Sequence, residues 1–294
     1  MTIGDAGNIL LSGLSIGGVY ALIALAYNVV FMTTNVLNLA QGALLMSGAM
    51  LGVLFYSRFG WPWYAALIVT VVAGGILALI EYFVAVRASL RGNSEGWIIS
   101  TFAFALLLQA LFALGMHNQV QSFPDLLPNV PLATLGGIRI IPQQIGMIVC
   151  ALAVAGLLSL LIRRTLVGKA LSAIAQDRDA AALRGIPIQR LSLLAFAAGG
   201  AIATFAGFLA GPITSAYPSM GLTFALYGFI AAVIGGMPRI DGALAGGFIL
   251  GIIETVTAYL FDPSYKDLVA LVAVLALLAI RPAGLLGRGT LRRV

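Results

Sequence analysis

The sequence is poor in charged residues. Only 9% of its 294 residues are Asp, Glu, Lys or Arg, whereas about a quarter of a soluble domain is charged. Hydrophobic residues make up 61% of the chain, and the mean hydropathy is +1.06. These values argue against a soluble domain and predict an all-α polytopic membrane protein. The net charge of +6 then bears on membrane topology, so we expect contact with membrane lipid and none with nucleic acid.

Residue types that carry metal or redox chemistry are scarce. The single cysteine, Cys150, lies in an apolar stretch, where a small buried side chain is expected and no disulfide within the chain is possible. The single histidine is His117. No cluster of His, Cys, Asp and Glu has the spacing of a metal site. We therefore expect neither a metal nor catalytic residues in this chain.

Two enzyme motifs are missing or out of context. The G-x-S-x-G pattern around Ser15 belongs to a strand-to-helix turn in hydrolases, but here it lies within an expected membrane span, far from His117. No G-x-x-x-x-G-K-[ST] phosphate loop occurs, and the fragment at residues 168–170 lacks its upstream glycine and its hydroxyl. The chain is therefore expected to be no enzyme and to need no cofactor of its own. If ATP drives it, partner subunits bind the ATP.

What the sequence does contain is long apolar runs separated by short polar or Gly/Pro breaks. They predict about nine spanning helices (eight to ten), of which the seventh and ninth are short enough to be broken or re-entrant. The expected spans are residues 11–31, 36–56, 63–86, 97–116, 143–162, 191–211, 222–236, 243–261 and 268–280. Residues 1–8 contain no Lys or Arg, so the first span is expected to be retained rather than cleaved as a signal peptide.

Basic residues in the loops predict the orientation, because Lys and Arg stay on the cytoplasmic side. Residues 163–190 are the longest polar stretch and hold six of the 16 Lys and Arg residues. Placing this stretch inside leaves only Arg58, Arg139 and Lys266 outside, with the N-terminus outside and the C-terminus cytoplasmic. Residues 117–142 then form the main outer loop, in which residues 130–140 read as a short hairpin. This loop is either a contact for an external partner or a solvated connector.

Glycine pairs with G-x-x-x-G spacing let helix backbones approach closely and predict packing seams. They are Gly13/Gly17, Gly48/Gly52, Gly207/Gly211, Gly242/Gly246 and Gly247/Gly251. The polar stretch also has a helical composition, since residues 170–184 are rich in Ala, Leu, Gln and Arg. A charged helix between two spans is therefore expected there.

Polar side chains inside apolar runs usually face a cavity or another helix. Asn35, Asn38 and Gln41 open the second expected span at three-residue intervals, which places them within about 120° of one helix face. This strip is interpreted either as part of a solute pathway or as helix capping and interhelical hydrogen bonding.

Two carboxylates also lie in apolar runs. Glu254, followed by Thr255 and Thr257, is a candidate for a buried network in the pathway or for a structural hydrogen bond. Glu81 is six residues from Arg87 and is expected to be solvated or paired near the inner membrane edge.

The polar stretch also carries a recognisable motif. Asp179-Ala180-Ala181, followed after three residues by Gly185, has the form E-A-A-x-x-x-G of cytoplasmic loops in bacterial ABC-importer permeases, with Asp for Glu. The string TLVGKALSAIAQDRDAAALRGI is similar to this loop in branched-chain amino acid permeases. GLSIGGVYALIALAYNVVF, NVLNLAQGALLMSGAML, AVIGGMPRIDGALAGGFILGIIE and RPAGLLGRG agree in the same order along nearly the whole chain. The chain thus resembles the LivH-type permease subunit of branched-chain amino acid ABC importers.

This resemblance implies a single transmembrane permease domain, residues 1–294, in the bacterial inner membrane. Its implied partners are a second, LivM-like permease subunit, two ATPase subunits and a periplasmic solute-binding protein. Residues 163–190 become the cytoplasmic coupling loop, because in the family the segment matched by residues 168–185 sits in a groove of the ATPase. The coupling residues implied are Arg164, Thr165, Gly168, Arg178, Asp179, Ala180, Ala181, Arg184 and Gly185. Of these, Arg178 and Arg184 can reach acidic groove residues, and Gly185 followed by Pro187 ends the helix.

One departure from the family concerns the solute pathway, whose candidate residues are Asn35, Asn38, Gln41 and Glu254. The family string N-F-A-H-G reads N-L-A-Q-G at residues 38–42, and Gln41 cannot titrate near neutral pH as histidine does. The expected solute is a branched-chain amino acid or a similar small molecule. Urea, amides and sugars stay open, as does a self-contained channel or ion-coupled carrier.

Overall fold

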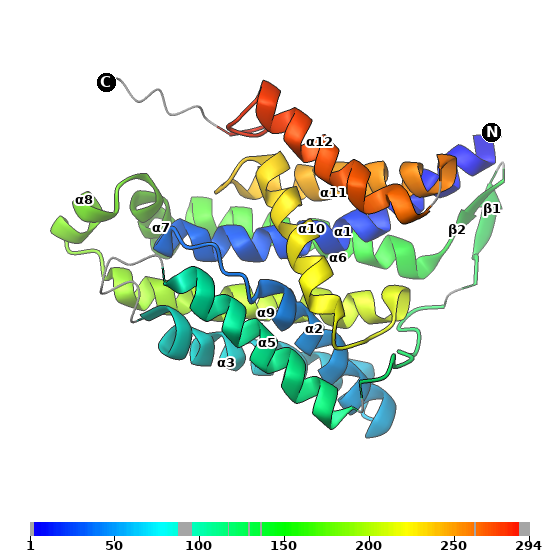
Figure 1. Cartoon of the computed structure of the whole chain (residues 1–294), viewed down its shortest axis with the longest axis horizontal. Coiled ribbons are helices and arrows are strands. Elements are labelled where there is room, and N and C mark those ends of the chain that lie inside the picture. Colours follow the sequence, from blue (N-terminus) through cyan, green and yellow to red (C-terminus); the bar gives the residue numbers. More distant parts are fainter. Residues whose placement is uncertain are drawn as a thin grey trace.

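A computed structural model describes residues 3–87, 96–116, 118–128, 130–135, 137–261 and 263–287. Its helices pack into one bundle, with most axes running along the long dimension of the molecule (Figure 1). The helices before the polar stretch are α1 (Ile3–Thr34), α2 (Gln41–Gly52), the π-helical turn η1 (Val53–Arg58), α3 (Trp63–Glu81), the π-helical turn η2 (Tyr82–Val86), α5 (Trp97–Gly115) and α6 (Pro142–Arg164). From that stretch onward they are α7 (Leu166–Gln176), α8 (Arg178–Leu183), α9 (Ile188–Thr214), α10 (Met220–Gly235), α11 (Ile240–Leu260), the short 3₁₀ helix η3 (Pro263–Tyr265) and α12 (Lys266–Ile280). His117, Arg91, Arg288, Arg292 and Arg293 lie outside the described residues.

The all-α membrane fold is confirmed, whereas the count of nine spans is not. Within the described residues, seven helical segments are long and apolar enough to cross a membrane. Expected spans two and seven form shorter helices, the 12-residue α2 and the 16-residue α10. Helix α2 is almost fully buried, and the π-helical turn η1 follows it directly in the chain.

The expected start of the second span at residue 36 is wrong, because α2 begins at Gln41. The backbone of Asn35 has a φ of +56°, and the Asn38 Oδ1 accepts a hydrogen bond of 2.9 Å from the Ala40 N–H. An Asn side chain that bonds the backbone two residues on offers that backbone an alternative to the helix. The chain between α1 and α2 is therefore a turn.

Glycine seams join the central helices, as the G-x-x-x-G spacing predicts. Helix α1 packs against α11 so closely that a Cβ at Gly251 would lie 2.3 Å from the Gly13 oxygen, and one at Gly17 would lie 2.8 Å from the Gly247 oxygen. Helix α9 approaches α2 in the same way at Gly207. Such backbone contacts give van der Waals packing in a medium where apolar side chains gain little from leaving the lipid.

The two ends of the bundle differ. At one end, called here the hairpin end, β1 (Ala133–Leu135) pairs antiparallel with β2 (Ile138–Ile140), which confirms the short hairpin. It rests on α1, because the Asn8 side chain bonds the Gly137 oxygen and the Arg139 N–H. The opposite end, called here the basic end, carries α7 and α8 (Figure 1). The polar stretch and the hairpin therefore lie on opposite sides of the bundle.

Candidate coupling helices and membrane polar clusters

The coupling stretch folds back against the end of α6. Thr165 caps α7, with its Oγ1 accepting a hydrogen bond of 3.0 Å from the Gly168 N–H. A Cβ at Gly168 would lie 2.3 Å from the Ile162 Cα, so only glycine fits this close return of the chain. Gly168 is buried at this turn, so its role is to shape the turn rather than to present a side chain to a partner.

The single helix expected over residues 170–184 is in fact two helices. Asp177 is extended, and its Oδ1 accepts a hydrogen bond of 2.9 Å from the Ala180 N–H, which ends α7 and caps α8. The predicted helix end is confirmed, since α8 stops at Leu183 and Gly185 has a φ of +78°. Asp is among the best N-cap residues, and this capping competes with helix continuation.

The coupling residues divide into outward-facing and inward-facing groups. Asp179, Ala180 and Arg184 are exposed, as are Arg164 and Gly185. Ala181 instead packs with Ile174 and Leu191 in a small apolar cluster beneath α8. The side chain of Leu183 is 90% exposed, and sequence reasoning missed it because an apolar residue in a helix is expected to be buried.

Arg178 is half-buried and contacts the bundle. Its Nη1 lies 3.4 Å from the backbone oxygen of Thr34, the last residue of α1. The expected contact of Arg178 with an acidic groove of a partner stays a prediction. The contact with Thr34 connects α8 to the turn that leads into α2.

Two of the three residues of the predicted polar strip come together. Asn38 and Gln41 are buried, and the Asn38 Nδ2 donates a hydrogen bond of 3.1 Å to the Gln41 Oε1. Asn35 is exposed and does not share their surroundings, because the residues that precede Gln41 are not helical. The strip is thus a buried amide pair.

Glu81 was expected to be solvated or ion-paired, and that expectation is wrong. Its side chain is fully buried, with Asn38 next to the carboxyl group. Neither Glu81 oxygen has a hydrogen-bond partner in the part of the chain that the structure describes. The carboxyl points into the bundle because the packing of α3 on α9 turns this helix face inward.

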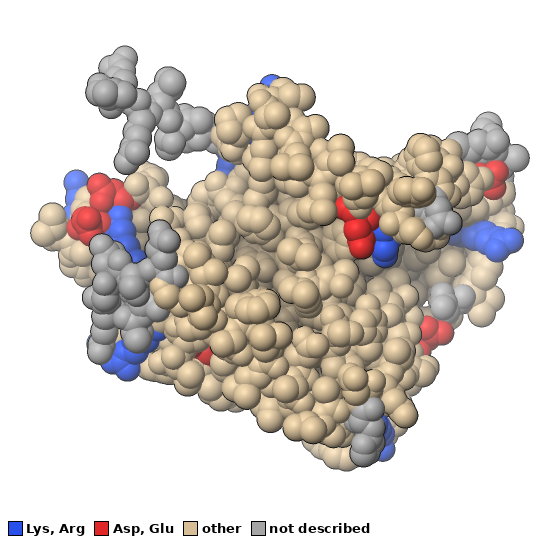
Figure 2. Space-filling model, viewed as in Figure 1, with Lys and Arg blue, Asp and Glu red and all other residues tan. Residues whose placement is uncertain are grey.

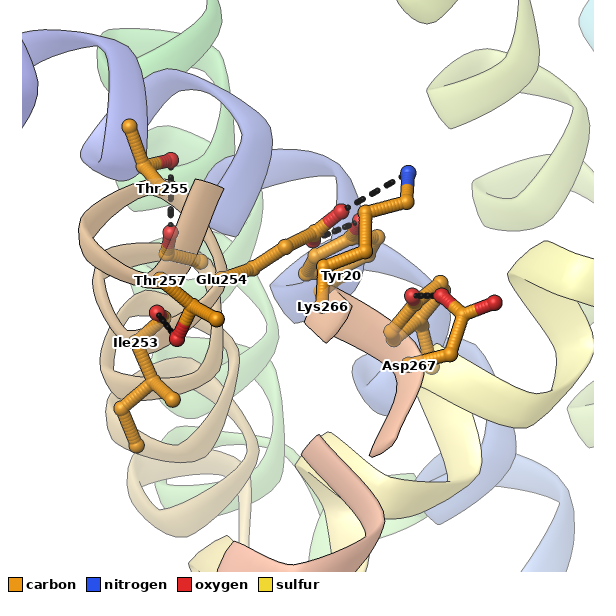
Figure 3. Close-up of polar contacts among 9 residues, drawn as sticks. Tyr20, Ile253, Glu254, Thr255, Thr257, Lys266 and Asp267 are labelled. Carbon is orange, nitrogen blue, oxygen red and sulfur yellow. Dashed lines mark hydrogen bonds and ion pairs between the residues drawn. The ribbon is translucent and has the colours of Figure 1, made fainter. Parts of the chain in front are cut away.

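Glu254 does belong to a buried network, which Figure 3 shows. Its Oε2 accepts a hydrogen bond from the Tyr20 hydroxyl, and its Oε1 lies 3.3 Å from the Lys266 Nζ. The two threonines expected in this network take no part, because Thr255 and Thr257 donate hydrogen bonds to the backbone of their own helix (Figure 3). The basic partner that the sequence did not reveal is Lys266.

A second carboxylate extends the network. The Tyr227 hydroxyl donates a hydrogen bond to Asp267, and the Tyr227 ring stacks on Tyr20 with 4.9 Å between the ring centroids. Four helices thus supply the set, with Tyr20 from α1, Tyr227 from α10, Glu254 from α11, and Lys266 and Asp267 from α12. We call Glu254, Lys266 and Asp267 the charged trio. The one feature of the sequence that points to this trio is the adjacent pair Lys266-Asp267, three residues after Pro263.

The position of this set along the bundle follows from α1, which runs through the bundle (Figure 1). Near the hairpin end, Ser12 bonds Gln144 in the first turn of α6, and near the basic end Met32 lines a small pocket between α6 and α11. At about 1.5 Å per residue, Ser12 and Met32 are about 30 Å apart. Tyr20 lies about 12 Å from the Ser12 level. The set therefore lies nearer the hairpin end than the basic end, and Lys266 directly follows the connection between α11 and α12.

The sequence also matches known proteins over almost its whole length. Residues 9–278 match the family described as "Branched-chain amino acid transport system / permease component". The permease protein BraD of Pseudomonas aeruginosa is 31% identical, and the alignment covers 97% of each chain. LivH of Escherichia coli K12 is 30% identical, with 96% of each chain covered. Both relatives are named high-affinity branched-chain amino acid transport system permease proteins.

A solved structure shares the fold. PsaBC of Streptococcus pneumoniae, in complex with Fab, matches with a TM-score of 0.53 and 16% sequence identity, covering 94% of this chain and 92% of that one. At this identity the likeness concerns the fold alone. The family match, together with the alignments to BraD and LivH over almost the full chain, shows the family. The chain belongs to the permease components of branched-chain amino acid transport systems, which are membrane subunits of ABC importers.

Proposed function

We propose that this permease subunit moves a branched-chain amino acid or a similar small solute inward across the bacterial inner membrane. Support for this solute class comes from BraD and LivH, which align with almost the full chain. In the proposed orientation, the hairpin end faces outward and the basic end faces the cytoplasm, because Arg163, Arg164 and Arg239 gather at the basic end.

The proposed complex contains a second, LivM-like permease subunit, two ATPase subunits and a periplasmic solute-binding protein. ATP is bound by the ATPase subunits, and this proposal rests on the lack of a phosphate loop anywhere in the 294 residues. Residues 117–142 form the proposed periplasmic loop, whose hairpin is held against α1 and so is more than a free connector.

Helix α8 is the proposed docking element for an ATPase subunit. The observation that carries this proposal is the exposed surface of α8, where Asp179 and Arg184 flank Leu183, whose side chain is 90% exposed. An apolar side chain with charged neighbours is typical of a protein contact with an apolar centre and a polar rim.

The contacts beneath α8 suggest how docking moves the membrane helices. Helix α8 rests on Leu191 of α9 through the apolar cluster, and Arg178 holds the end of α1. A displacement of α8 is therefore passed to two long helices and to the turn that holds the amide pair Asn38 and Gln41. A bundle that has two packed arrangements can then open in turn to the outer and the inner side of the membrane.

The docking proposal is tested with the double variant Asp179→Lys, Gly185→Val. The first change reverses a charge on the α8 surface, and the second places a β-branched side chain at a φ of +78°, which only glycine adopts easily. We expect ATP-driven uptake by the reconstituted complex to fall roughly tenfold or more. A Cβ at Gly185 meets no neighbouring atom, so the fold itself is spared a steric clash.

The matched control is Gln189→Lys, a charge change at an exposed position in the first turn of α9, just outside the docking segment. It should leave uptake near the wild-type rate. Equal uptake by the double variant and the control would show that α8 is not the docking element.

A further inference from the structure

A pocket at the basic end lies where three long helices meet, with α1 and α6 at their ends and α11 at its start. Its volume is about 160 Å³, roughly ten times the space that one water molecule needs. Its wall combines the apolar Met32 with the polar residues Ser159, Arg163, Arg239 and Asp241. The pocket therefore lies where apolar helices give way to charged residues.

One arginine in this wall has no counter-charge. Arg163 forms an ion pair of 3.1 Å with Asp241. The Arg239 side chain has neither an ion pair nor a hydrogen bond within the described part of the chain. Its backbone is nevertheless fixed, because the buried Asn28 side chain donates a hydrogen bond of 2.8 Å to the Arg239 oxygen. A positioned arginine is thus left available to an anion.

The pocket offers further donors to the same anion. Only the Nη2 of Arg163 contacts Asp241, so the rest of its guanidinium group can donate elsewhere. The Ser159 hydroxyl adds another donor. Helix α11 begins in this wall at Ile240, and its N-cap residue provides no side-chain cap. Arginine forks match phosphate oxygens, and the start of a helix favours a negative charge.

An apolar stripe on α6 leads away from Arg163. Val149, Leu152, Gly156, Leu160 and Arg163 follow one another at steps of three or four residues, so they share one face of the helix. All five are exposed, and a Cβ at Gly156 would meet no atom within 4 Å. This face therefore has room for a hydrocarbon chain that begins at the pocket.

We infer that the pocket binds the headgroup phosphate of an anionic phospholipid, whose acyl chain lies along the apolar stripe of α6. Arg239 and Arg163 pair with the phosphate oxygens, and the Ser159 hydroxyl donates to one of them. Basic pockets between membrane helices on the cytoplasmic side bind headgroups of this kind. The inference goes beyond the proposed function, because it concerns the lipid around the permease and not the solute.

The distribution of charge favours this ligand over others of similar chemistry. Two arginines against one aspartate give the pocket a net positive charge, and Asp241 is already engaged by Arg163, so the ammonium of a zwitterionic lipid is disfavoured. A free phosphate ion would leave the apolar stripe unused. On the face that Figure 2 shows, charged side chains lie mainly toward the ends of the molecule, and the surface between them is largely uncharged. A lipid with its headgroup at one end of the bundle matches this distribution.

The first test counts the lipids that stay on the assembled complex in native mass spectrometry. The complex is given equal amounts of phosphatidylglycerol and phosphatidylethanolamine, and the wild type should retain phosphatidylglycerol in preference. Arg239→Gln should retain it roughly tenfold less, because a charged hydrogen bond to the phosphate is lost. The fold should not suffer, since the Arg239 side chain has no partner to lose among the described residues.

The matched control is Arg139→Gln, which removes the same charge from an exposed position in β2, at the hairpin end. It should retain phosphatidylglycerol as the wild type does. Equal retention by the two variants, or equal retention of the two lipids by the wild type, would overturn the inference. So would a complex that retains no lipid, because another subunit would then cover the pocket.

The second test asks whether the acyl chain lies on α6. Gly156→Trp fills the stripe at its one glycine and should lower the retained phosphatidylglycerol several-fold. Gly115→Trp is the control, because Gly115 is an exposed glycine at the end of α5 where a Cβ also meets no atom within 4 Å. Unchanged lipid retention by Gly156→Trp, or displacement of the lipid by millimolar inorganic phosphate, would overturn the inference in favour of a free phosphate site.

Discussion

At the residue scale, the buried carboxyl group of Glu81 shows how strongly the environment decides what a side chain does. It lies inside the bundle next to Asn38, with no hydrogen-bond partner among the described residues. Glu254 is similarly buried but is held by Tyr20 and Lys266. Burying an unpaired charge is expensive, and removing one member of a buried pair leaves the other uncompensated. The two carboxyl groups should therefore respond in opposite ways to the same substitution.

The prediction is that Glu81→Gln does not lower the melting temperature of the detergent-solubilised protein and raises it by up to a few degrees. The amide has nearly the size of the carboxyl group and cannot ionise in the buried site. Glu254→Gln is the matched control and should lower the melting temperature by several degrees, because it leaves Lys266 without its ion-pair partner. A clear destabilisation by Glu81→Gln would contradict this prediction and would show that the carboxyl group makes a stabilising contact in the folded protein.

The sequence reveals which polar residues are unusual but not which ones meet. Asn38 and Gln41 stand three positions apart, and their contact was within reach of the pattern. The contact between Tyr20 and Glu254 joins residues that are 234 positions apart, so no local sequence pattern predicts it. Glu81 was misplaced because its inward face depends on how α3 packs on α9, which composition alone does not determine.

At the scale of elements, the seam between α1 and α11 should be sensitive to a single side chain. We predict that Gly251→Leu lowers thermal stability strongly, because even its Cβ would lie 2.3 Å from the Gly13 oxygen and the two backbones would have to separate. The expected loss is about 1–3 kcal/mol or more. Fluorescence-monitored thermal unfolding in detergent measures it.

Gly156→Leu is the control for this seam. Gly156 lies within α6, and a Cβ there meets no atom within 4 Å. The same substitution should therefore be tolerated with little change in melting temperature. If both variants are equally stable, the close approach of α1 and α11 is not required for the fold.

A second element-scale prediction concerns the connection between α8 and α1. Arg178→Ala removes the contact with the Thr34 oxygen, so movement of α8 should no longer reach the end of α1 directly. We expect ATP hydrolysis by the complex to continue while uptake falls several-fold. Arg190→Ala, an exposed arginine in the first turn of α9, is the control and should change neither. Parallel loss of hydrolysis and uptake in Arg178→Ala would instead place Arg178 at the ATPase contact.

Element boundaries follow from the sequence where local chemistry dominates. Gly185 marks the end of α8 because its backbone conformation favours glycine, and residues 133–140 form a hairpin around a glycine turn. The break at Asp177 and the late start of α2 at Gln41 were not foreseen. In both places a short polar side chain bonds the backbone two or three residues ahead, and helix-forming composition conceals this competition.

At the scale of the whole molecule, length and hydropathy predict the all-α membrane bundle, because a chain with 9% charged residues has few other ways to fold. The number of spans is less accessible, since α2 and α10 are too short to be judged by length. The opposite placement of hairpin and coupling helices follows from the alternation of spans. The ion pair between Lys266 and Glu254 required the fold, because the two residues come from different helices and no local spacing connects them.

The central claim is that this chain conducts its solute only when ATPase partners drive it. The most direct measurement is uptake of radiolabelled L-leucine into vesicles that contain the complex purified with this chain, with the solute-binding protein outside and ATP inside. We predict uptake with ATP, none with a non-hydrolysable analogue, and none in vesicles that contain this chain alone. Equal uptake by the isolated chain without ATP would contradict the account and would indicate a self-contained channel or carrier.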